Sequence, residues 1–242
     1  GKFALRIVTP IRRIALELGA GGFASVTANS AMPGKPLRDM QLPRGSSLGG
    51  RLVVDGKPAT GVDLELVQSD RSAGSVVTPM RVTTDANGQF RWNHLAPSTE
   101  YSIYSLVDQD ADATLPTTLV ETPAAGTFAD FGDVPAKKGH RVVLRFITED
   151  RKPVPPGAYC YLSRSTAWTS GRQSIPEKFA STVRFNAVPT EVIAVGIRVP
   201  GYEVVNVQPE CQVDLNGRHA IFCDEDNSLT FTLKATVAST GN

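Results

Sequence analysis

Short runs of β-branched and aromatic residues, each closed by a turn signal, constrain this 242-residue chain more than any other feature. Asn-Gly pairs separate neighbouring runs at Asn87-Gly88 and at Asn216-Gly217. Asn-Gly is the strongest two-residue hairpin signal, because a type I′ turn requires a positive φ at both central positions. The sequence therefore predicts an all-β fold. The expected strands cover residues 48–54, 62–67, 80–84, 89–94, 101–106, 141–147, 183–186, 192–199, 203–207, 211–215, 218–223 and 228–234.

Residues 11–18 are the ambiguous segment. Apolar residues at positions 11, 14, 15 and 18 have helical spacing, whereas Ile14, Leu16 and Leu18 alternate as in a strand. Pro10 precedes the segment and a glycine-rich stretch follows it. The pattern leaves helix and strand both open.

Two features of the sequence recur at nearly the same interval. An aromatic residue near the start of a strand recurs from Phe90 to Phe185, 95 residues later, and the glycine of a linker recurs from Gly45 to Gly139, 94 residues later. This interval is about the length of one β-sandwich domain. We expect the C-terminal half of a truncated upstream sandwich at 1–43, a sandwich at 44–136, a second, divergent sandwich at 137–236 and a tail at 237–242.

This division predicts two properties of the chain. The linker at 133–139 is short and holds one proline, which favours an elongated arrangement of two sandwiches with a small polar interface. Half a sandwich at 1–43 leaves apolar side chains without partners. The side chains expected to be partly exposed for this reason are Phe3, Leu5, Ile7, Leu16, Leu18 and Phe23.

Three stretches resemble carboxypeptidase regulatory-like (transthyretin/prealbumin-like) domains. Residues 47–62 resemble the opening strand, turn and Gly-Val step of that family, residues 83–90 its central hairpin, and Pro200-Gly201-Tyr202 a later aromatic step. The resemblance is good over 46–105, partial over 138–236, and fits the second half of a unit over 1–43. It implies tandem Greek-key β-sandwiches, transthyretin-like or Ig-like, with seven strands per unit. Such domains are accessory modules of secreted or surface proteins, so the resemblance also implies an extracytoplasmic location.

Candidate nucleophiles and histidines have weak sequence contexts. Ser47 occupies the centre of a G-x-S-x-G match, but a nucleophile elbow needs a strand before it and a helix after it. Here a proline-containing linker precedes and a strand follows, so a domain-linking turn is the better interpretation. His94, His140 and His219 show no metal-ligand spacing, and we expect each to be a strand residue with one partner.

A weak calcium candidate is the acidic run Asp108, Asp110 and Asp112, whose spacing matches the start of a calcium loop. Ala113 stands where such a loop needs glycine, and Leu119 where it needs glutamate. A hydrated acidic turn is the simpler interpretation.

The cysteines allow two interpretations. Cys211 and Cys223 flank Asn216-Gly217 almost symmetrically, and a single bulge would bring their sulfur atoms opposite each other. A disulfide and two buried thiols both stay open. Cys160 is expected to be a core thiol.

Aromatic residues supply a weak glycan candidate. Trp92 alternates with Phe90 on one strand face, which indicates a core position. Trp168 lies in a Ser/Thr-rich stretch and is expected to be exposed, where it could stack on a sugar ring.

Composition excludes some functions. The net charge is +1, with 25 basic and 24 acidic residues, which argues against nucleic-acid binding, and no apolar run is long enough to span a membrane. We expect non-catalytic spacer or adhesion modules of a larger secreted or surface protein, without a cofactor. Their partners would be neighbouring domains of the same polypeptide, with a glycan or a surface protein as a further partner. A carbohydrate-binding module and an accessory domain of a peptidase or other hydrolase are the alternatives.

Overall fold

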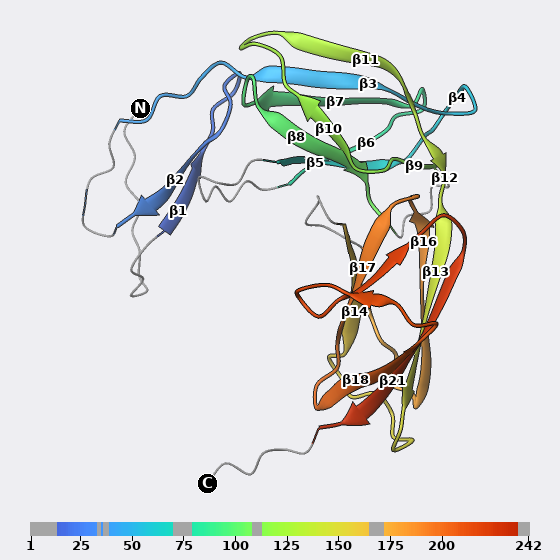
Figure 1. Ribbon diagram of the computed structural model, residues 1–242. Helices are drawn as coiled ribbons and strands as arrows, with labels where there is room; N and C mark the ends of the chain where they lie inside the picture. Colours follow the sequence, from blue (N-terminus) through green and yellow to red (C-terminus); the bar gives the residue numbers. More distant parts are fainter. Residues whose placement is uncertain are drawn as a thin grey trace.

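The computed structural model describes residues 14–32, 35, 39–69, 79–107, 113–164 and 172–236. These residues form strands and turns and contain no helix, so the predicted all-β class is confirmed. Within the same ranges there is accordingly no helix that could cross a membrane. Two groups of sheets lie end to end, and the strands of one group run in a different direction from those of the other (Figure 1).

The first group has two main sheets, ordered β10-β8-β5-β6 and β11-β3-β4, with β7 also pairing with β3. Its strands are β3 (Ser46–Val54), β4 (Lys57–Pro58), β5 (Asp63–Gln68), β6 (Met80–Thr83), β7 (Gln89–Leu95), β8 (Glu100–Ser105), β10 (Thr118–Glu121) and β11 (Phe128–Pro135).

The second group has sheets ordered β16-β13-β21-β18 and β15-β14-β17-β20-β19. Its strands are β13 (His140–Thr148), β14 (Tyr159–Arg164), β15 (Arg172–Ser174), β16 (Ala180–Val188), β17 (Val192–Arg198), β18 (Tyr202–Gln208), β19 (Gln212–Val213), β20 (His219–Phe222) and β21 (Asn227–Ala235).

The same pairing pattern occurs in both groups. β3 is antiparallel to β7 and parallel to β11, just as β13 is antiparallel to β16 and parallel to β21. In the other sheet, β5 pairs with β6 and β8, just as β14 pairs with β15 and β17. In both groups the register begins with a pair before a bulge, Ser46–Leu95 and His140–Val188. The next pairs are Leu48–Trp92 and Val142–Phe185, so Trp92 corresponds to Phe185. Phe90, opposite Gly50, corresponds to Val183, so the 95-residue interval from Phe90 to Phe185 does not join equivalent positions.

Each group encloses its own hydrophobic core. Phe90 and Trp92 are buried in the first core with their rings edge to face, and Phe185 is fully buried in the second, near the stacked rings of Phe146 and Phe231. The predicted burial of Phe90, Trp92 and Phe185 is confirmed. Strand β16 shows how the sequence specifies this, because its side chains alternate strictly between exposed and buried along most of its length.

The two Asn-Gly pairs behave differently. Asn216-Gly217 joins β19 to β20, which pair antiparallel, so this hairpin is confirmed. Asn87-Gly88 instead connects β6 in one sheet to β7 in the other. In both turns the glycine has a positive φ and the asparagine does not, so neither is type I′. An aspartate closes each turn, since Asp85 and Asp214 each accept two backbone N–H groups through Oδ1.

The N-terminal part of the described chain forms a separate antiparallel pair, β1 (Ile14–Leu18) and β2 (Val26–Ala31). The ambiguous segment is therefore a strand from Ile14 onward. Leu16 and Leu18 are half-buried and Phe23 is exposed, as expected, whereas Phe3, Leu5 and Ile7 lie outside the described residues.

Candidate functional site: the junction between the two cores

The covalent connection between the two groups is held by strand pairing. Pro135 ends β11, the N–H of Ala136 donates to Val53 O at 2.7 Å, and β13 begins only four residues later at His140. Between them β12 (Lys137–Lys138) pairs antiparallel with β9 (Ala113–Thr114). The segment that the sequence presents as a linker is therefore mostly strand.

Gly139 lets the two groups approach closely at this connection. A Cβ atom there would lie 2.5 Å from the Ala187 Cα and 2.6 Å from the Thr114 Cγ2, closer than real side chains come. The missing side chain therefore allows the start of β13 to pass between β9 and the end of β16.

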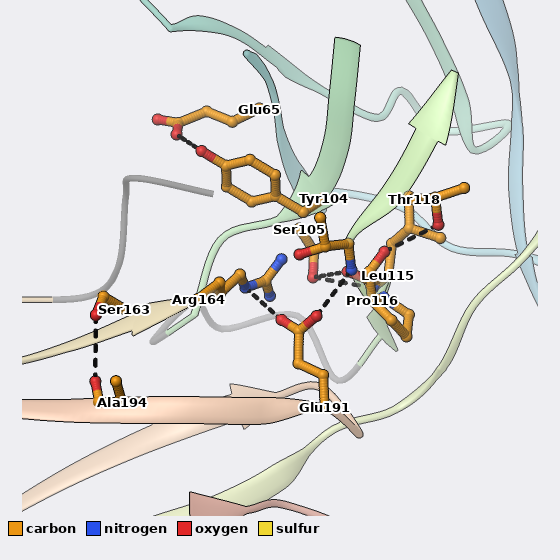
Figure 2. A network of polar contacts seen from close by, with 11 residues as sticks. Glu65, Tyr104, Ser105, Leu115, Pro116, Thr118, Ser163, Arg164, Glu191 and Ala194 are labelled. Carbon is orange, nitrogen blue, oxygen red and sulfur yellow. Dashed lines mark hydrogen bonds and ion pairs between the residues drawn. The ribbon is translucent and has the colours of Figure 1, made fainter. Parts of the chain in front are cut away.

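A second contact between the groups is built around an ion pair of the second group (Figure 2). Arg164 ends β14 in the second group and is only 4 % exposed, and its Nε lies 2.7 Å from Oε1 of Glu191, which precedes β17. The other Glu191 oxygen, Oε2, accepts the backbone N–H of Thr117 at 3.0 Å. Thr117 belongs to the first group, just before β10, so one carboxylate links a buried cation to the neighbouring core.

The Arg164 guanidinium also faces an aromatic ring of the first group. Its Cζ lies 4.9 Å from the ring centroid of Tyr104, a fully buried residue of β8. The Tyr104 hydroxyl donates to Glu65 Oε2 at 2.8 Å, and Glu65 Oε1 pairs with Arg81 Nη2 at 2.9 Å. A continuous polar chain thus runs from Arg81 on β6, through the first group, to Arg164 and Glu191.

The charges in this chain of polar contacts balance, because two guanidinium groups face two carboxylates. Burial lowers the pKa of Arg164, while the charge of Glu191 and, more weakly, Tyr104 and Glu65 act in the opposite direction. The Arg164 Nη1 and Nη2 atoms have no hydrogen-bond partner within the part of the chain that the structure describes. The cation is therefore held by one carboxylate and one aromatic face, an arrangement suited to fixing orientation.

The residues with catalytic potential lie apart from this junction or make structural contacts. Ser47 is part of β3 instead of a turn, and its Oγ donates to Asn93 Oδ1 at 3.1 Å. His94 is an exposed residue of β7 with a φ of 61°. His140 Nε2 lies 3.0 Å from Thr190 Oγ1, and His219 packs edge to face on Phe231.

Two predicted binding candidates fall outside the described residues. Asp108, Asp110 and Asp112 are among them, and so is Trp168. Within the described ranges no three His, Cys, Asp or Glu side chains gather as metal ligands would. Calcium binding and glycan binding therefore stay predictions.

All three cysteines lie in described segments and none of them is disulfide-bonded, so the structure forms no Cys211–Cys223 disulfide. The hairpin register gives the reason. Gln212 pairs with Ala220 and Val213 with His219, which places position 211 level with position 221, two residues short of Cys223. Cys160 is fully buried, as expected for a core thiol.

We expect Cys223 to resist alkylation in the native protein. Burial, together with the charges of Glu191 and Asp224, raises its pKa to about 12, so the reactive thiolate is scarce at neutral pH. Titration with a thiol reagent should label Cys211 slowly and leave Cys160 and Cys223 unlabelled until the chain is unfolded. Two thiols missing after denaturation without reductant would instead reveal the disulfide.

Stability should fall as the pH drops below about 6.5, the ordinary pKa of histidine. Burial lowers the pKa of His219, so the unfolded chain binds this proton before the folded chain does and is favoured below that value. The Arg218 N–H and guanidinium hold the pKa of Asp214 down, so Asp214 affects the stability only below about pH 4. Urea unfolding should give a lower free energy of unfolding at about pH 5.5 than at about pH 7.5, and His219→Phe should remove this difference. If the difference is unchanged in His219→Phe, another group is responsible for it.

The sequence matches no known protein family and no curated relative. Among solved structures, the minor pilin GBS52 of Streptococcus agalactiae is 11% identical, with a TM-score of 0.34, covering 81% of this chain and 99% of that one. The shaft pilin SpaA of Lactobacillus rhamnosus GG is 12% identical, with a TM-score of 0.29 and coverages of 80% and 98%. The Bacillus anthracis TIE protein is 14% identical with a TM-score of 0.30. The match covers 79% of this chain and 34% of that protein, so the chain spans about a third of it. At these values the likeness does not establish a shared function.

Proposed function

We propose that this chain is a non-catalytic spacer or adhesion module of a larger secreted or surface protein, and that it presents two β-sandwich domains at a set mutual orientation. The single observation that carries the proposal is the strand-paired connection between the cores. From Ala136 to Gly139 the backbone is bonded to β3, paired with β9 or packed against β16, so no slack separates the two groups.

The domains of this proposal are residues 44–136 and 137–236, with residues 1–43 the second half of an upstream sandwich and 237–242 a tail. The separate cores and the recurring pairing pattern support these boundaries. The resemblance of residues 46–105 to carboxypeptidase regulatory-like domains supports an extracytoplasmic location. The neighbouring domains of the same polypeptide are the proposed partners.

A spacer is useful only if it transmits direction. Interfaces between domains are commonly small and polar, and relative motion is then the default. Here Val107, from the first group's chain, packs into the core of the second, in addition to the backbone pairing at β12. These contacts support a fixed arrangement in place of two independently moving beads.

Fluorescence energy transfer between two labels tests the proposal. Donor and acceptor fluorophores on the two ends of the full chain should give one transfer efficiency that is insensitive to viscosity and denaturant until unfolding begins. A short Gly-Ser insertion between Ala136 and Lys137 should broaden the distribution of transfer efficiencies, while circular dichroism shows that both cores stay folded. An unmodified chain with the same broad distribution as the insertion variant would contradict the spacer function.

A further inference from the structure

The two connections between the cores join different layers of the molecule. The covalent connection runs from β11, in the sheet that contains β3, to β13, in the sheet that contains β21. Arg164 ends β14 and Glu191 immediately precedes β17, and both of these strands belong to the opposite sheet of the second group. The two residues reach Tyr104 on β8 and Thr117 beside β10, in the opposite sheet of the first group.

Two attachment points on opposite layers prevent a rotation of one group relative to the other that a single attachment point allows. A chain connection alone leaves rotation about its own axis, even when it is short. A contact between the other two layers removes that rotation. Because this contact combines an ion pair of 2.7 Å with a hydrogen bond of 3.0 Å to a backbone N–H, it fixes direction as well as distance.

We propose that Arg164 and Glu191 form an orientation latch: a buried ion pair of the second core that grips the Thr117 backbone and the Tyr104 ring and sets the angle between the two sandwiches. The inference rests on the proposed spacer function for its purpose. Its geometry can be tested separately.

The chemistry of the pair fits a role in specificity. Buried ion pairs contribute little net stability, because desolvation offsets most of their attraction, and their best-attested use is to select one packing arrangement among several. Arg164 shows this cost directly, since burial lowers its pKa and two of its nitrogen atoms have no hydrogen-bond partner among the described residues. An apolar contact would avoid this desolvation cost, but it would not favour one rotation of the two groups over another.

Apolar replacement of both partners separates orientation from folding. In Arg164→Met/Glu191→Met no unpaired charge is left in the interface, so the cores should stay folded while the angle between them loses its definition. Glu191→Gln is the milder variant, because its amide oxygen can still accept the Thr117 N–H while the charge is lost. Asp133→Asn is the matched control, since it removes a short Arg51–Asp133 ion pair that lies within the first group.

Distances between paired spin labels measure the angle. Labels at Asn87 and Asn216 occupy exposed turns of the two groups, and a Cys211→Ser background leaves only the buried Cys160 and Cys223 thiols. The parent and Asp133→Asn should give one narrow distance peak, and the double variant a peak at least twofold broader, with Glu191→Gln between them. A narrow, unshifted peak in both latch variants would overturn the latch and leave the spacer standing. A broad peak already in the parent would overturn the spacer function itself.

Discussion

Truncation of Phe185 to alanine is expected to lower the free energy of unfolding of the second core by about 3–5 kcal/mol. Phe185 is fully buried and lies opposite Val142 in the β13–β16 pair. Removing its ring takes away apolar contacts and leaves a cavity that the paired strands cannot close. Chemical denaturation followed by fluorescence and circular dichroism measures the change.

Phe222→Ala is the matched control for that prediction, because Phe222 is in the same group but 56% exposed, and its loss should cost less than about 1 kcal/mol. Phe90→Ala should repeat the large effect in the first core, since the Phe90 ring is likewise buried and packs edge to face on Trp92. Small effects at both buried phenylalanines would contradict the placement of their rings in the two hydrophobic cores.

Replacing Glu191 with leucine is expected to destabilise the protein by about 3 kcal/mol, near the lower end for a broken buried ion pair because the Glu191 side chain keeps 17% exposure. The substitution leaves the Arg164 guanidinium buried without its counter-charge and deprives the Thr117 N–H of its acceptor. Thermal or urea unfolding of the full chain reports the loss.

A double-mutant cycle separates the ion pair from its surroundings. Arg164→Met in the Glu191→Leu background should restore most of the lost stability, because the remaining unpaired charge is then gone. If the double variant were as unstable as the sum of the two single variants, the residues would act independently and the pair would have no role as a unit.

Much of the fold follows from local signals in the sequence. Alternation of apolar and polar residues located most strands and placed Phe90, Trp92 and Phe185 in cores, because alternate side chains of a strand face opposite sides. The Asn216-Gly217 hairpin could also be predicted from the sequence. At Asn87-Gly88 the same dipeptide joins two different sheets, since a local turn signal does not say whether the flanking strands pair with each other or with distant ones.

The junction could be recognised only in part. Cys160, Leu162 and Arg164 share one face of β14, and all three are buried. A charged residue at an inward position was therefore a readable sign of a buried ion pair, which the sequence interpretation missed. Its partner Glu191 lies outside the regular strand pattern, and Thr117 contributes only a backbone N–H, so nothing local distinguishes them. The cysteine register depended on a one-residue difference in the turn, which side-chain patterns do not specify.

Small-angle X-ray scattering of the full chain, compared with the variant carrying a Gly-Ser insertion between Ala136 and Lys137, tests most directly whether the two groups of sheets form one rigid body. The proposed fixed junction predicts that one bent arrangement of the two groups, as drawn in Figure 1, accounts for the scattering of the parent chain. Only the insertion variant should require an ensemble. A parent chain that itself requires a broad ensemble of domain orientations, or that scatters as one compact sphere, would contradict this account.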